Sequence, residues 1–120
     1  RKARIFGAPG REIPHDEASV TLAVDSLARG MDPTAAPAGF TVELAFRDAP
    51  RWHLVNADGA VTPHAGGAPG RADVRLRARY ADLVEVMAGN LPPARALLRG
   101  GLIPLGRPGD LRRLGTMLGA

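Results

Sequence analysis

Apolar and polar residues alternate most regularly in two segments, and this period of two predicts β-strands at residues 40–46 and 72–80. In the first segment one face is wholly apolar, and in the second segment apolar residues alternate with charged ones. Strands of this kind belong to a sheet that is solvated on one side, so helices are expected to cover its apolar side.

Apolar residues at helical spacing predict four helices. The first runs from about residue 16 to residue 31, where apolar residues recur at helical spacing: Val20, Val24, Leu27 and Met31. Asp16 is expected to cap its start, and Gly30 is expected to end it. Three shorter helices are expected in the C-terminal part of the chain, over residues 81–88, 93–99 and 109–118.

Three further strands are expected, and prolines restrict two of them. Trp52 and Leu54 share a face of the second strand, which leads into a hairpin turn at residues 56–59. The third strand, residues 60–64, is weakened by Pro63. A short strand at residues 102–105 also contains a proline, and because proline cannot donate a ladder hydrogen bond, this strand is expected at a sheet edge.

The chain is expected to form a single domain. Residues 1–14 are basic and interrupted by glycine and proline, which predicts a flexible N-terminal arm before a domain at residues 15–120. The chain starts at Arg1 rather than at Met, which favours a piece of a longer protein. It contains no run of about 18 apolar residues, so a soluble, cytoplasmic protein is predicted.

Composition narrows the expected partners. The formal net charge is +4, and Lys2 is the only lysine among 16 basic residues, a bias typical of a bacterial genome of high GC content. Nucleic acid is not expected as a partner, because Trp52 and Tyr80 do not lie in a basic cluster. Cysteine is absent, so disulfides and thiolate chemistry are excluded.

A row of arginines is expected on the charged side of the sheet. Arg75, Arg77 and Arg79 are spaced by two and therefore project from the same face. This row is either a docking patch for an anionic membrane surface or a partner domain, or a solvated face that prevents association between sheets. Glu43 on a neighbouring strand is expected to pair with one of the arginines.

Residues that carry out bond-making chemistry are sparse, and the chain is not expected to be an enzyme. Of the histidines His15, His53 and His64, the last two lack a third convincing ligand for zinc. The glycine-rich residues 66–71 lack the Lys-Ser/Thr pair of a phosphate-binding loop. No metal, cofactor or catalytic residue is therefore predicted.

Two segments resemble the sterol carrier protein type 2 domain family. They are GFTVELAFRDAPRWHLVNADGAV at residues 39–61 and RADVRLRARYADLVEVMAGNLPPARALLRGGLIPLG at residues 71–106, within a similarity that extends over residues 16–118. The chain departs from the family pattern at Pro104 and at an inserted Arg-Pro before the last helix. The order and spacing that carry the resemblance are those of Ala72, Asp73, Asp82, Leu83, Gly89, Ala94, Gly100 or Gly101, and Gly106.

The resemblance implies an α+β fold: a five-stranded, largely antiparallel sheet with helices covering one face and an apolar tunnel between them. It implies binding or transfer of a long-chain apolar ligand, such as a fatty acid, acyl-CoA, isoprenoid or sterol-like lipid. The alternative is an accessory or dimerising domain of a larger enzyme, whose tunnel is filled by its own side chains. The family's non-enzymatic members contribute no catalytic residue.

The residues themselves support an apolar site on physical grounds. Each buried methylene of an alkyl chain gains about 0.8 kcal/mol, so a dry apolar cavity is sufficient to bind one. For every candidate residue, close packing in a solid core is the alternative. The candidate wall residues are Phe40, Val42, Leu44, Phe46, Trp52, Leu54, Leu83, Met87, Leu91, Leu97, Leu98, Ile103, Leu105, Leu114, Met117 and Leu118.

The last helix is expected to be the most mobile element. Leu111, Leu114 and Leu118 form one apolar stripe on it, and several glycines loosen it. Such a helix suits a lid over a tunnel or a contact with a lipid surface. The alternative is a helix that only packs.

Overall fold

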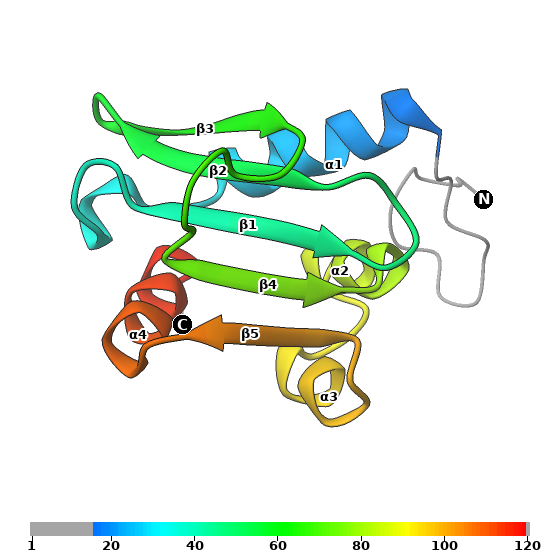
Figure 1. Cartoon of the computed structure of the whole chain (residues 1–120). Helices are drawn as coiled ribbons and strands as arrows, with labels where there is room; N and C mark the ends of the chain where they lie inside the picture. Colours follow the sequence, from blue (N-terminus) through cyan, green and yellow to red (C-terminus); the bar gives the residue numbers. More distant parts are fainter. Residues whose placement is uncertain (1–15, 120) are drawn as a thin grey trace.

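The computed structural model describes residues 16–119, and the predicted basic arm at residues 1–14 lies outside them. Five strands form a sheet with helices packed against it (Figure 1), which confirms the predicted α+β fold. The strands are β1 (Thr41–Phe46), β2 (Trp52–Ala57), β3 (Ala60–Ala65), β4 (Val74–Ala78) and β5 (Leu102–Gly106). The helices are α1 (Glu17–Arg29), the 3-10 turn η1 (Pro33–Ala35), α2 (Tyr80–Met87), α3 (Pro93–Leu98) and α4 (Pro108–Met117).

The strand order is β3-β2-β1-β4-β5, so β1 lies at the centre of the sheet. β1 and β4 run parallel, whereas the other neighbouring strands pair antiparallel. The sheet is therefore mixed but mostly antiparallel. Pro63 and Pro104 both lie in edge strands, where the missing donor is tolerated.

Register divides the sheet into two faces. Leu44 of β1 lies beside Trp52 of β2 and Leu76 of β4, and these side chains belong to the face that the helices cover, which we call the inner face. Glu43 and Arg75 lie side by side on the opposite, outer face. Figure 1 shows α1 and α2 behind the sheet, while the β3–β4 loop crosses in front of it. The one-sided cover expected from the alternation is therefore present.

The first helix has the ends that the sequence predicts. Asp16 accepts a hydrogen bond from the backbone N–H of Ser19 over 3.1 Å, which caps the start of α1. Gly30 follows the last helical residue. Val20 and Val24, which form the predicted apolar stripe, are buried against the sheet core.

The turn of the β2–β3 hairpin is two residues shorter than expected, because Asn56 and Ala57 belong to β2. Asp58 and Gly59 alone form the turn, with φ of 53° and 76°, a combination that two-residue hairpins require. Asn56, which the sequence placed in the turn, is instead buried in β2. Its Nδ2 donates to the carbonyl oxygens of Pro33 and Ala36 over 2.9 and 2.8 Å. Asn56 thereby fixes the proline-rich connector that follows α1.

The strand predicted at residues 72–80 is shorter than expected, because α2 already begins at Tyr80. The Tyr80 backbone N–H donates to Asp48 Oδ1 over 2.9 Å, and its ring meets that of Phe46 edge to face. Burial is the main cause that raises the pKa of Tyr80 to about 12, with the charge of Asp16 second. Arg79 keeps an extended backbone, so alternation continues across the boundary between strand and helix.

Candidate functional site

A cavity of about 750 Å³ lies between the inner face of the sheet and the helices. Its volume falls within the range of roughly 300–1,000 Å³ that is usual for small-molecule pockets. All four α-helices and four of the strands contribute to its wall. Leu97 and Leu118 line the cavity and are 49% and 47% exposed, so the cavity reaches the surface beside them.

The sheet supplies the floor of this cavity through simple alternation. Val42 and Leu44 point inward from β1, and Leu54 and Leu76 stand beside them on the neighbouring strands. These four side chains are all buried. The floor is therefore built from the same positions that the period-two pattern assigns to the apolar face.

Eight of the predicted wall residues line the cavity. They come from β1, β2 and the helices that cover the inner face. Contact of these residues with a ligand stays a prediction. They are Val42, Leu44, Leu54, Leu83, Met87, Leu97, Leu114 and Leu118.

Six other candidates lie on the inner side or on α3 but do not line the cavity. Phe40, Phe46, Leu91 and Met117 are buried in the packed core, which is the alternative that the sequence left open. Trp52 packs half-buried against that core. Leu98 is 89% exposed, because it projects from α3 away from the sheet.

Ile103 and Leu105 are wrongly placed by the sequence analysis. In β5, Leu102 pairs with Ala78 and Pro104 pairs with Leu76, so Leu102 and Pro104 face inward. Ile103 and Leu105 consequently point to the outer face, and Leu105 is 44% exposed. The prediction was wrong because it rested on the apolar character of these side chains and not on strand register. In a strand that is apolar on both faces, apolar character does not tell which face a residue lies on.

Several lining residues escaped the sequence analysis. Leu27 and Met31 of the first helical stripe reach the cavity, as do Val86 of α2 and Leu111 of α4. Leu76 also lines it, from the strand whose charged face drew attention. The helical periodicity that predicted α1 marked Leu27 and Met31, and this signal could have found them.

The chemical character of the cavity is almost uniformly apolar. Among the described residues that line it, Ser26 carries the only polar side chain, and none is ionisable. Apart from the Ser26 hydroxyl, the described side chains of the wall are those of leucine, valine, methionine and proline. Such a wall favours the removal of aliphatic surface from water.

An ion pair between a buried carboxylate and a half-exposed arginine joins α2 to the end of α3. Asp82 of α2 is 4% exposed, and Arg99 at the end of α3 donates to its two oxygens over 3.1 and 2.9 Å. Gly101 passes so close that a side chain there would collide with the Asp82 carboxylate. The pair therefore keeps α3, with Leu97, against α2.

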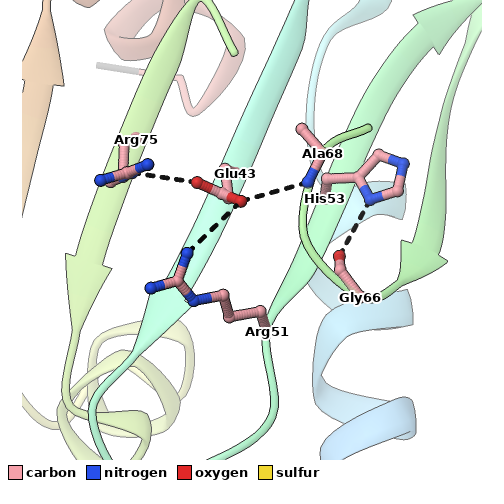
Figure 2. Close-up of polar contacts among 6 residues, drawn as sticks. All are labelled: Glu43, Arg51, His53, Gly66, Ala68 and Arg75. Atoms are coloured by element: carbon pink, nitrogen blue, oxygen red, sulfur yellow. Dashed lines mark hydrogen bonds and ion pairs between the residues drawn. The ribbon is translucent and has the colours of Figure 1, made fainter. Parts of the chain in front are cut away.

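The predicted arginines of the outer face lie in unequal environments, and Figure 2 shows the contacts of one of them, Arg75. Arg75 Nε donates to Glu43 Oε1 over 2.9 Å, which confirms the expected cross-strand pair. Arg77 and Arg79 are exposed and form no ion pair within residues 16–119. The three arginines are therefore not equivalent.

The histidines of the hairpin also lie on the outer face. His53 and His64 stack with ring centroids 5.0 Å apart, and His53 Nδ1 lies 2.9 Å from the Gly66 carbonyl oxygen (Figure 2). Within the described part of the chain, no three potential ligand side chains gather as a metal site. None of the helices between residues 16 and 119 has the length and apolar character needed to cross a membrane.

Solved structures with similar folds include carrier domains and a part of an enzyme. The sterol carrier protein domain 2 of Helicoverpa armigera has a TM-score of 0.63 and 15% identity, covering 86% of this chain and 87% of its own. The palmitated SCP2L2 from Aedes aegypti has a TM-score of 0.58 and 15% identity, covering 84% of this chain and 92% of its own. These likenesses support the fold.

A third similar structure is much longer than this chain. The stereoselective inverting sec-alkylsulfatase from Pseudomonas sp. has a TM-score of 0.62 and 24% identity over 79% of this chain. The match covers only 15% of the sulfatase chain. The same fold therefore also occurs as a small part of a larger enzyme.

The sequence comparisons decide the family. None of the curated protein sequences matches this chain. The family model described as the SCP-2 sterol transfer family matches residues 16–105, a segment that runs from the cap of α1 into β5 and includes most of the cavity wall. The chain belongs to the SCP-2 sterol transfer family.

Proposed function

We propose that this chain binds a long-chain apolar molecule in the inner cavity and transfers it between surfaces or proteins. The observation that carries the proposal is a cavity of about 750 Å³ whose described lining contains no ionisable side chain. Domains of this family are typically lipid-binding modules without catalysis. The Aedes aegypti relative was solved in a palmitated form, which supports a fatty acyl chain as the first ligand to test.

The energetics favour a ligand that is mostly hydrocarbon. Burial of sixteen carbons offers on the order of 12 kcal/mol before the costs of association are paid. No specific polar contact is needed to obtain this free energy. Because the wall is built from flexible and branched aliphatic side chains such as Met87, it supports binding of several chain types.

The test compares two tryptophan substitutions. Met87 lines the cavity, so Met87→Trp is expected to narrow it and to weaken binding of a fluorescent fatty acid by about tenfold or more. Leu98 is 89% exposed and does not line the cavity, so Leu98→Trp is the matched control and should bind normally. Unfolding by urea verifies that both variants are folded.

Two outcomes would contradict the proposal. The first is a wild-type chain that binds no fluorescent fatty acid. The second is a Met87→Trp variant that is folded and binds as tightly as the Leu98→Trp control, because the ligand would then lie elsewhere.

A second candidate is an accessory or dimerising role in a larger enzyme. The observation in its favour is the sec-alkylsulfatase, of which the matched segment is only 15%. Native mass spectrometry of protein purified without added lipid separates the two roles. Co-purified apolar mass supports the carrier role, whereas a bare dimer supports the accessory role.

We propose that α4 acts as the lid of the cavity. Leu111, Leu114 and Leu118 line the cavity from this helix and its C-terminal end. Gly109 and Gly115 lie in the helix itself, where glycine lowers helical stability. Removal of residues 109–120 is expected to alter fatty-acid uptake, and unchanged uptake would refute the lid.

A further inference from the structure

A second hollow, of about 740 Å³, lies on the outer face of the sheet. Its walls are the β3–β4 loop, the outer sides of β1 and β4, the end of β5 and the start of α4. Leu105 belongs to this hollow, whereas its neighbour Pro104 lines the inner cavity. The sheet therefore separates the two spaces, and nothing in the proposed lipid binding uses the outer one.

The outer hollow is lined by more positive than negative side chains. The positive side chains come from four separate segments: the turn before β2, the β3–β4 loop, β4 itself and the β5–α4 junction. The positive residues are Arg51, Arg71, Arg75 and Arg107, and the negative residues are Glu43, Asp73 and Asp110.

Each of the three carboxylates is already engaged. Asp73 Oδ2 accepts the backbone N–H of Thr41 over 2.8 Å. Asp110 Oδ1 accepts from Arg113, which does not line the hollow, over 2.9 Å. Glu43 is in contact with Arg75, Arg51 and the Ala68 backbone N–H. Each acidic residue of the hollow thus has an internal contact, and Glu43 and Asp110 are also paired with arginines.

Glu43 orients two of the arginines (Figure 2). Arg75 approaches it through Nε at 2.9 Å, and Arg51 approaches its other oxygen at 3.8 Å. The same oxygen accepts the Ala68 backbone N–H over 3.1 Å, which fixes the loop above the sheet. Because Arg75 uses only Nε for this contact, its two terminal nitrogens remain available as donors.

The remaining two arginines have no such internal role. Within residues 16–119, Arg71 and Arg107 form no ion pair and are exposed. Arg107 also precedes α4, whose start has no side-chain cap, so the backbone N–H groups of Gly109 and Asp110 lack a side-chain acceptor there. A helix start favours negative charge nearby, and Asp110 in the first turn of α4 already supplies one such charge.

We propose that the outer hollow binds a phosphate-bearing anion, with Arg71 and Arg107 as its principal ligands and Arg75 as a third. Guanidinium groups bind phosphate oxygens in pairs, and arginines from different segments can enclose one group from several sides. The glycine-rich β3–β4 loop thus contributes through Arg71 rather than as a phosphate-binding loop. The phosphate comes either from a small soluble molecule or from a lipid headgroup.

The test uses inorganic pyrophosphate as the soluble probe, measured by calorimetric titration. The double variant Arg71→Gln/Arg107→Gln is expected to weaken binding about tenfold or more, because each substitution removes charge-assisted hydrogen bonds between a guanidinium group and a phosphate oxygen. Arg77→Gln/Arg79→Gln is the matched control, since it removes the same charge from exposed arginines outside the hollow. The control is expected to bind pyrophosphate within about twofold of the wild type.

Vesicle flotation distinguishes the two sources of phosphate. Phosphatidylcholine vesicles with phosphatidic acid are compared with phosphatidylcholine vesicles alone. If the Arg71/Arg107 variant loses binding to phosphatidic acid vesicles and the control keeps it, the hollow is a headgroup site. If the variant loses binding to pyrophosphate and the control keeps it, the ligand is soluble. Either pattern supports the hollow.

Three results would overturn the proposal. One is a wild-type chain that binds neither probe. The second is equal weakening by both double variants, which would indicate only the overall positive charge. The third is loss of vesicle binding in the control alone, which would assign docking to Arg77 and Arg79. The Met87→Trp variant should retain phosphate binding, so failure of the lipid proposal and failure of this one are distinguishable.

Discussion

The two faces of the sheet bury adjacent residues of one strand in different ways. Glu43 is 5% exposed on the outer face, where Arg75, Arg51 and the Ala68 N–H surround its carboxylate. Leu44 is fully buried on the inner face, where it borders the cavity. Polar partners thus surround the Glu43 carboxylate, whereas the Leu44 side chain forms part of a cavity wall. Burial alone therefore does not tell whether a position is packed or lines a site.

The largest expected effect is on the inner face. Leu44→Ala removes a fully buried side chain and is expected to lower the free energy of unfolding by about 2–5 kcal/mol. Arg77→Ala on the outer face is the control and is expected to stay within about 0.5 kcal/mol of the wild type. Urea unfolding measures both. Equal effects of the two substitutions would remove the distinction between the faces.

The next effect concerns the outer face. Glu43→Gln removes a buried charge that Arg75 and Arg51 contact and is expected to lower the free energy of unfolding by about 1–3 kcal/mol. Fatty-acid binding should be unchanged, because the residue does not line the inner cavity. Weakened fatty-acid binding in a folded Glu43→Gln variant would show that the two faces are coupled.

A smaller effect, of opposite sign, is expected in α4. Gly115 lies within the helix, and an added Cβ would meet no neighbouring atom within 4 Å. Gly115→Ala is therefore expected to raise the free energy of unfolding by up to about 1 kcal/mol. Thermal unfolding measures the change. A loss of stability would contradict this expectation, because it would mean that the packing around α4 has no room for the added Cβ.

The last effect appears only at high pH and is absent at neutral pH. The pKa of Tyr80 is raised from 10.0 to about 12, so the unfolded chain loses this proton first as the pH rises. Its contribution to stability is intact below pH 10 and is lost progressively between pH 10 and 12. In urea titrations across this window, Tyr80→Phe should lose stability less steeply than the wild type. Parallel curves would assign the pH dependence to other groups.

Periodicity predicted the elements well because it reports local geometry. The alternation of residues 40–46 identified the central strand, and the helical spacing of Val20 and Val24 identified α1. The family resemblance supplied the five-stranded, largely antiparallel sheet, whereas the strand order and the parallel pairing of β1 with β4 were not predicted. Proline placement correctly indicated the edge position of β5.

The site was predicted less completely, because its wall depends on register and on unfilled volume. In β5 both faces are apolar, and only pairing with Leu76 reveals that Pro104 faces the cavity and Leu105 does not. Phe40 and Met117 match the same apolar pattern as Leu44, yet they pack in the core. No local pattern states where side chains leave space between them.

The parallel pairing of β1 with β4 has a consequence for how the chain folds. The β2–β3 hairpin closes through two residues and is a local event, whereas Glu43 and Arg75 meet across 32 positions of sequence. The entropy of closing that loop must be paid before the middle of the sheet exists. The β2–β3 hairpin is therefore expected to form early in folding. The inner cavity and the helices that cover it are expected to be completed only after β1 has paired with β4.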